Sequence, residues 1–162
     1  MKNENVVNFV PKNVIKSKIY EVRGRKVMLD KDLAELYGVE TKVLNQAVKR
    51  NEHRFPDDFM FRLKREEFSN LRSQFVTSSW GGSRYPPRAF TEYGILMLSN
   101  VLKSERAIKV SIQIIRVFVE MREMAQDYRE LIENLRKIEK RQDVESKEIW
   151  KAIRMLQRKV LY

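Results

Sequence analysis

The chain has 162 residues, no cysteine and a formal net charge of +11 at pH 7. The lack of cysteine excludes disulfides, thiolate metal sites and cysteine nucleophiles, and it fits a reducing cytosol. The positive charge favours a polyanionic partner, with nucleic acid ahead of an anionic membrane surface. No apolar run approaches the roughly 18 residues of a membrane span, and no signal-peptide pattern is present, so we expect a cytoplasmic protein with no membrane partner.

The first part of the chain predicts a tail and a β-hairpin. Residues 1–16 are polar and interrupted by Pro11, so we expect a loose tail. Residues 19–22 and 26–29 are rich in β-branched and aromatic side chains and flank Gly24. Two such segments around a glycine turn predict a hairpin that leads into the next element.

Residues 29–50, LDKDLAELYGVETKVLNQAVKR, predict two short helices joined by a tight turn. Asp30 is the expected N-cap of the first helix, and Gly38 can adopt the left-handed conformation that ends it. The small Ala34 lies four residues before Gly38, where a crossing helix requires a short side chain. This pattern indicates a helix-turn-helix, with a recognition helix over about 41–51.

One face of that predicted second helix carries amide and basic side chains. Asparagine and glutamine can make bidentate contacts to adenine in the major groove, and lysine can reach guanine or phosphate. The alternative interpretation is the solvated face of an ordinary amphipathic helix. The residues on this face, spaced i, i+3, i+4 and i+7, are Lys42, Asn45, Gln46 and Lys49.

A short strand is predicted after the helix-turn-helix. Pro56 ends the helical region at or before Phe55. Residues 59–63 alternate apolar with longer side chains, and a strand here can act as a wing beside the recognition helix. Residues 41–65 contain seven Lys/Arg and three Asp/Glu, a surplus that would position the protein on phosphates. Ordinary surface charge is the alternative.

The segment after this strand predicts a helix over 66–75 and then a loop over 76–87, rich in serine, glycine and proline. Arg84 and Arg88 would add a second phosphate contact there. The loop lacks the lysine and the spacing of a nucleotide-binding P-loop, so that interpretation is rejected.

A short strand over 88–90 is expected to precede two helices. Thr91 would cap the first helix, which extends to Leu102 and is expected to bury four apolar side chains, Ile95, Leu96, Leu98 and Val101. Ser104 would cap the second helix. Its many β-branched residues leave a strand as the alternative, but the i, i+3, i+4 repeats favour a helix.

The C-terminal part of the chain predicts paired helices. Apolar residues step by four and three along a heptad seam, which breaks near Gln142 and resumes in a shifted register from Ile149. The seam predicts a coiled coil or a helical hairpin, and a single long helix packed back on the core is the alternative. The seam residues before the break are Met124, Tyr128, Leu131, Leu135 and Ile138.

Several blocks of the sequence closely resemble the phage ORF-six N-terminal domain, which belongs to the KilA-N/Bro-N group of virus and phage DNA-binding domains. The blocks, within residues 14–102, are 32–41, 48–51, 54–63, 80–84 and 89–94. The resemblance implies a DNA-binding module of bacterial or prophage origin, often joined to variable C-terminal parts. It implies no target sequence, and the C-terminal seam lies outside it.

No catalytic constellation is evident in the sequence. The single histidine, His53, lies in a turn beside Arg54, and a lone histidine without cysteine cannot make a typical zinc site. Asp57 and Asp58 are adjacent and would point to opposite sides of an extended segment. We therefore expect no enzyme, metal or cofactor, and no small-molecule substrate.

Together these patterns predict an α+β fold with a hairpin, a helix-turn-helix, a wing-like strand and long C-terminal helices. The expected parts are a tail (1–16), a DNA-binding domain (17–122) and a helical extension (123–162) that forms a homodimer. The expected function is sequence-specific regulation on double-stranded DNA; the alternative is an antirepressor or adaptor that acts through the extension. The expected DNA-binding residues are Lys42, Asn45, Gln46, Lys49, Arg50, Arg54, Arg62, Arg65, Arg84 and Arg88.

Overall fold

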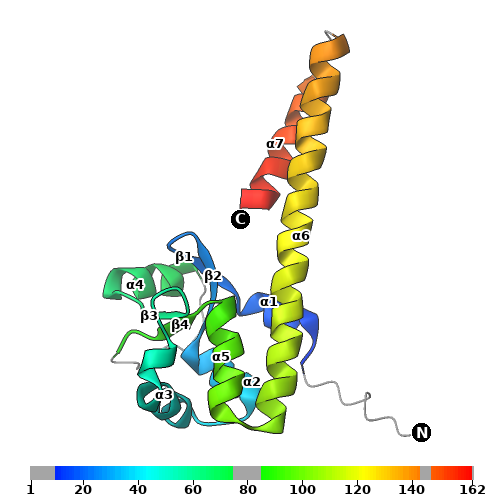
Figure 1. Ribbon diagram of the computed structural model, residues 1–162. Coiled ribbons are helices and arrows are strands. Elements are labelled where there is room, and N and C mark those ends of the chain that lie inside the picture. The colour runs from blue at the N-terminus through cyan, green and yellow to red at the C-terminus, as the bar shows by residue number, and fades with distance from the viewer. Residues whose placement is uncertain (1–9, 75–84, 143–146, 162) are drawn as a thin grey trace, which may run out of the picture. The chain divides into compact units, whose positions relative to one another are not determined.

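The computed structural model describes residues 10–74, 85–142 and 147–161 (Figure 1). The chain divides into two units, Met1–Val117 and Phe118–Tyr162. The predicted boundary at 122 and this division both fall within one long helix. The described part contains no helix with the length and apolar character that crossing a membrane requires.

The first unit has the predicted α+β architecture, built around a four-stranded antiparallel sheet in the order β1-β2-β4-β3. The strands are β1 (Tyr20–Val22), β2 (Arg25–Leu29), β3 (Met60–Arg62) and β4 (Arg88–Phe90). The helices are α1 (Lys12–Ser17), α2 (Asp30–Tyr37), α3 (Thr41–Arg50), the 3₁₀ helix η2 (Glu52–Arg54), α4 (Arg65–Gln74), α5 (Glu92–Leu102) and the first part of α6 (Glu105–Gln142).

The predicted hairpin is confirmed, with Tyr20 opposite Val27 and Val22 opposite Arg25. The two residues between the strands, Arg23 and Gly24, have φ values of 55° and 72°. A two-residue hairpin loop requires positive φ because its twist must match that of the strands. The strand predicted over 59–63 is also confirmed, as β3 at one edge of the sheet.

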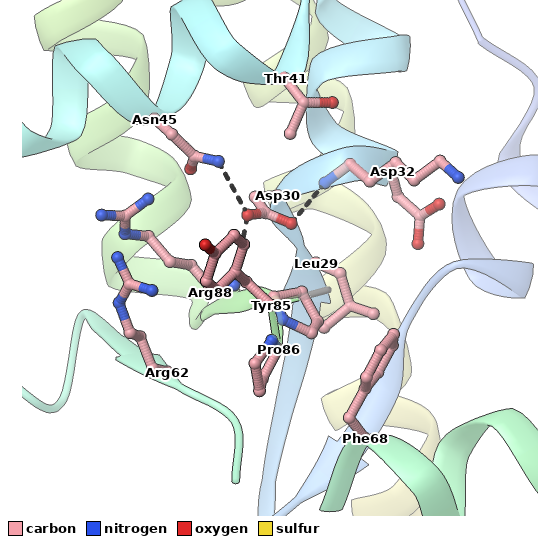
Figure 2. Close-up of a pocket in the computed structure, with 12 residues that line it drawn as sticks. Leu29, Asp30, Asp32, Thr41, Asn45, Arg62, Phe68, Tyr85, Pro86 and Arg88 are labelled. Atoms are coloured by element: carbon pink, nitrogen blue, oxygen red, sulfur yellow. Dashed lines mark hydrogen bonds between the residues drawn. The ribbon is translucent and has the colours of Figure 1, made fainter. Parts of the chain in front are cut away.

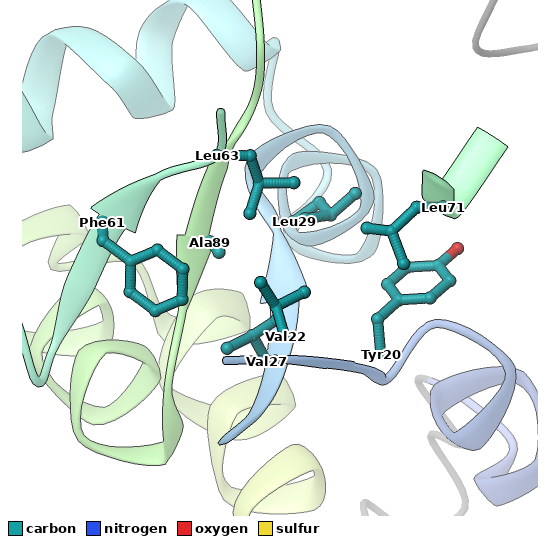
Figure 3. Close-up of a cluster of buried hydrophobic side chains, with 8 residues drawn as sticks. All are labelled: Tyr20, Val22, Val27, Leu29, Phe61, Leu63, Leu71 and Ala89. Atoms are coloured by element: carbon teal, nitrogen blue, oxygen red, sulfur yellow. The ribbon is translucent and has the colours of Figure 1, made fainter. Parts of the chain in front are cut away.

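The second half of β2 is buried on both faces of the sheet, and it accordingly has the continuous apolar run Val27-Met28-Leu29 rather than strict alternation. Val27 and Leu29 point into the cluster drawn in Figure 3, where Leu71 of α4 lies against Tyr20. Met28 is fully buried on the opposite side of β2, where α2 and α5 contact the sheet. Packing on both faces therefore holds the end of β2, where the chain enters α2.

The start of α5 is as predicted, because the Thr91 side chain accepts a hydrogen bond from the Gly94 amide at 3.4 Å. Gly94 packs so closely on Phe59 that a Cβ atom there would overlap the Phe59 carbonyl. Ile95 and Leu98 are buried as expected. The burial predicted for Leu96 is wrong: this side chain is 58% exposed, because α5 turns only one face toward the sheet.

Part of the segment expected to be loose is ordered. Helix α1 covers Lys12–Ser17, and its Ile15 is fully buried. The Gln113 amide of α6 donates to the Val10 carbonyl at 3.0 Å, which fixes the chain just before α1. The described part of the N-terminal segment is therefore packed through contacts with residues about 100 positions away.

Helix α6 begins as predicted, with the Ser104 hydroxyl accepting from the Ala107 amide at 3.0 Å. Ser111 shares a 2.7 Å hydrogen bond with the Tyr37 hydroxyl of α2, and Arg106 donates to the Leu36 carbonyl at 3.2 Å. Burial raises the pKa of Tyr37, so this hydroxyl stays protonated. These contacts hold the end of α2 against α6.

The second unit contains the remainder of α6 and α7 (Lys147–Leu161). Ile132 of α6 and Ile153 of α7 are buried in it, with 6% and 0% exposure. The helices run in opposite directions (Figure 1), so of the two predicted forms this unit is a helical hairpin. Only part of the predicted seam is covered, since Met124, Leu131 and Ile138 are exposed.

Candidate nucleic-acid interface

Helices α2 and α3 are joined by a short turn, as the sequence predicts. Gly38 ends α2 in the left-handed conformation, with φ 73° and ψ 31°. Ala34, 1% exposed, lies on the buried side of α2. On α3, Leu44 and Val48 are buried, which leaves the opposite side of the helix to solvent.

The N-cap position predicted for Asp30 is wrong by one residue, although its carboxylate accepts from a first-turn amide as expected. Strand β2 runs directly into α2, so Leu29 occupies the N-cap position and Asp30 is the first helical residue. The buried Asp30 carboxylate accepts from the Lys31 amide at 2.7 Å, from Asn45 Nδ2 at 3.0 Å and from the Arg88 amide at 3.3 Å. Asp30 therefore fastens α3 to the beginning of α2 and to β4.

The exposed side of α3 is basic, with one apolar member that the sequence patterns did not single out. Val43 is 47% exposed and shares this side with basic and amide residues. Val43 directly precedes the buried Leu44. This position in the sequence would have indicated that Val43 lies outside the row of buried residues on α3. The exposed members of this α3 face are Lys42, Val43, Gln46, Lys49 and Arg50.

Six of the predicted basic residues are exposed and have no acidic partner among the described residues. Arg54 lies in η2, Arg62 in β3, and Arg65 begins α4. Exposed cations that are not held in ion pairs are free to meet an anionic ligand. Among the residues that the structure describes, ion pairs are formed by none of Lys42, Lys49, Arg50, Arg54, Arg62 and Arg65.

A pocket of about 460 Å³ lies beside the first turn of α3 (Figure 2). Asn45 of α3 contributes to its wall, as do Arg62 and Arg88 from neighbouring strands. The pocket is lined by Leu29, Asp30, Lys31, Asp32, Thr41, Asn45, Arg62, Phe68, Tyr85, Pro86, Pro87 and Arg88.

Two arginines face each other across the last pair of strands. Arg62 of β3 is directly opposite Arg88 of β4, and Figure 2 shows both guanidinium groups extending to the same side of the pocket. Burial, followed by the charge of Arg62, lowers the pKa of Arg88 from its usual value. Arg88 Nε is buried without a hydrogen-bond partner. Like charges placed opposite one another in a sheet are unfavourable, and an anion between them would relieve the repulsion.

Asn45 is turned toward the protein in this structure. Its Nδ2 donates to Asp30, and its Oδ1 is buried without a hydrogen-bond partner. A base contact by Asn45 would require this amide to leave Asp30, so base reading by Asn45 stays a prediction. Gln46, the next residue, is exposed and is the amide of α3 that is open to a ligand.

The structure brings together Asn45, Arg62 and Arg88 around the pocket. Lys42, Gln46, Lys49 and Arg50 lie along one side of α3. The predicted phosphate contact at Arg84, with Phe75 and most of the loop expected over 76–87, lies outside the described residues.

The network around Asp30 predicts a large effect on stability. We expect Asp30→Ala to lower the free energy of unfolding by about 3 kcal/mol, because three N–H donors lose a charged acceptor in a partly buried place. Urea denaturation measures the change. Asp57→Ala, in an exposed turn, is the matched control. A loss below about 0.5 kcal/mol for Asp30→Ala would contradict the organising role.

Comparison with protein-family models matches residues 17–101 to the ORF6N domain. The matched region covers a little over half of the chain, from the end of α1 to the end of α5. It includes the α3 face and the pocket, and it excludes the helical hairpin. Comparisons with curated proteins and with solved structures gave no match.

Proposed function

Because the chain belongs to the ORF6N domain family, a family of phage-type DNA-binding or regulatory domains, we propose that it is a sequence-specific transcriptional regulator that binds double-stranded DNA. Helices α2 and α3 form the helix-turn-helix, and α3 enters the major groove. The function is binding in the cytosol, without catalysis or a cofactor.

The observation that carries this proposal is the α3 face. Lys42, Lys49 and Arg50 are exposed and unpaired among the described residues, on the side of α3 that faces away from the core. These cations contact phosphates and fix the helix on the duplex. Between them, Gln46 makes base contacts, and Val43 packs on a thymine methyl group.

The paired arginines of the sheet supply a further phosphate contact. Arg62 and Arg88 lie opposite one another, and a phosphate between them neutralises their repulsion. The backbone amide of Arg88 is anchored by Asp30, which also holds Asn45 of α3. The same carboxylate thereby links the phosphate contact of the sheet to the recognition helix.

The base contact predicts a loss of specificity when Gln46 is shortened. A preferred site is first selected from a random duplex library, and affinities for that site and a scrambled site are then measured. Gln46→Ala should reduce the ratio of the two affinities about tenfold, because one bidentate base contact contributes about 1–3 kcal/mol to discrimination. Lys42→Gln, the control, should weaken binding to both duplexes alike. Equal losses on both sites for Gln46→Ala would exclude the base-reading role.

An antirepressor or adaptor that acts through the helical hairpin is the second candidate. The exposed apolar residues Met124, Leu131 and Ile138 favour it, because such a surface suits a protein partner. An adaptor has no use for the cations of α3, so replacing Lys42 and Lys49 should leave its partner capture intact. A regulator that binds DNA should lose its activity with the same replacements.

Pairing of two copies is part of the proposed function. A regulator that reads two half-sites needs two recognition helices, and an exposed apolar stripe on the hairpin supplies a surface for association. The hairpin lies beyond the family match, so its role rests on its own side chains.

A further inference from the structure

Helix α6 carries two apolar stripes within the second unit, and α7 covers one of them. The covered stripe contains the buried Ile132, together with the half-buried Tyr128 and Leu135. The other stripe, Met124, Leu131 and Ile138, is 44%, 46% and 49% exposed. Its members are seven residues apart, so they lie almost in line along one side of the helix. A heptad row of this kind is the pattern of a helix that packs on another helix.

We propose that this row, the α6 stripe, packs in antiparallel orientation on the α6 stripe of a second copy of the chain. The inference specifies the surface and the direction of the pairing that the proposed function requires, and it rests on that function for its biological role only.

Charges along one edge of the α6 stripe are segregated by sign. The N-terminal half of this edge carries Glu123, Asp127 and Glu130, and the C-terminal half carries Lys137 and Arg141. Like charges at i and i+4, such as Glu123 with Asp127 and Lys137 with Arg141, destabilise an isolated helix. Asp127, Lys137 and Arg141 form no ion pair within the described residues.

An antiparallel partner converts this segregation into complementarity. When Leu131 lies opposite Ile138 of the second copy, Asp127 lies near Arg141 and Glu130 lies near Lys137 across the interface. Each contact occurs twice because of the two-fold symmetry. In a parallel pair this charged edge would face the opposite edge of the partner helix, which carries Tyr128, Ile132 and Leu135, so these opposite charges would not meet. Charge complementarity therefore favours the antiparallel orientation.

A charge-swap experiment on the full chain tests the orientation. Sedimentation equilibrium should show a monomer–dimer equilibrium for the wild type. Glu130→Lys should weaken dimerisation about tenfold, because two attractive contacts become repulsive. Adding Lys137→Glu to the same chain should restore the affinity to within about threefold. Glu133→Lys, exposed on the far side of α6 from Leu131, makes the same charge change and should leave dimerisation unaltered.

Engineered cysteines give a second readout, since the chain has none of its own. In the proposed register, Leu131 of one chain lies opposite Ile138 of the other. The two Leu131 residues are therefore seven residues apart, or about 10 Å along the helix, which is too far for a disulfide. Leu131→Cys alone should therefore stay uncrosslinked under mild oxidation. Mixed with a size-tagged Ile138→Cys chain, it should form a disulfide-linked heterodimer.

Three results would overturn the inference: a wild-type chain that is monomeric at all concentrations, a charge swap that fails to restore association, or efficient crosslinking of Leu131→Cys to itself. DNA binding is measured separately on the same proteins. A monomer that binds DNA would overturn the pairing and leave the proposed DNA binding by the α3 face intact. A dimer that does not bind DNA would support the pairing and overturn the proposed DNA binding.

Discussion

Replacing both Lys42 and Lys49 by glutamine should weaken binding to a random-sequence duplex about 60-fold at 0.1 M salt. Both lysines are exposed on α3, seven residues apart, and neither forms an ion pair within the described chain. Each phosphate contact contributes about 0.9 to the slope of log affinity against log salt. Two contacts therefore contribute about 1.8 decades between 1 M and 0.1 M salt. Glutamine keeps most of the side-chain length, so the helix itself should be unaffected.

The control for this prediction is a second pair of exposed cations, Lys16 of α1 and Arg25 of β2. Helix α1 and the turn between β1 and β2, which Arg25 follows directly, lie away from α3 in the first unit (Figure 1). Each double replacement lowers the formal net charge from +11 to +9, so long-range attraction changes equally. A fall in affinity that is the same for both pairs would show that net charge alone drives binding, against a specific role of α3.

Gly94→Ala should destabilise the first unit by about 3 kcal/mol or more and lower its melting temperature by about 10 °C. The added Cβ would overlap the carbonyl oxygen of Phe59, which cannot move freely because it accepts from the Thr91 amide at 3.0 Å. Alanine favours the helical state over glycine by about 1 kcal/mol, which is too little to offset the overlap.

Differential scanning calorimetry, or thermal melting followed by circular dichroism, measures this loss. Asn100→Ala, at an exposed position of the same helix, serves as the control and should change stability little. A Gly94→Ala protein that melts within about 2 °C of the wild type would contradict the close approach of α5 to the segment before β3.

Elements specified by neighbouring residues were predictable from the sequence. Arg23-Gly24 gives the hairpin its positive φ angles, Gly38 ends α2, and Thr91 caps α5. Each of these signals depends on residues within four positions of one another. The α+β class followed from them, as did the order of the elements.

Features specified by distant partners were not predictable. The packing of the segment before α1 depends on a hydrogen bond from Gln113. The orientation of Asn45 depends on Asp30, which is also bonded to the Arg88 amide of β4. A capping-type residue such as Asp30 has the same local pattern whether its carboxylate bonds to its own helix or to neighbouring elements. The pairing of Arg62 with Arg88 required the strand register, which no local pattern supplies.

The heptad spacing of the seam was predictable from the sequence, but the seam residues that contact α7 were not. Its two interleaved rows have the same spacing, so the sequence alone could not tell which row faces α7. The structure turns Tyr128 and Leu135 inward and leaves Leu131 exposed. The side of α6 on which α7 packs therefore determines which residues remain available to a second chain.

The measurement that tests the central claim most directly is fluorescence anisotropy of the full chain with a labelled random-sequence duplex across a salt series. We expect binding whose log affinity falls linearly with log salt, with a slope equivalent to several phosphate contacts at about 0.9 each. Binding with a flat salt dependence, or no binding at low salt, would contradict DNA recognition by the α3 face and the paired arginines.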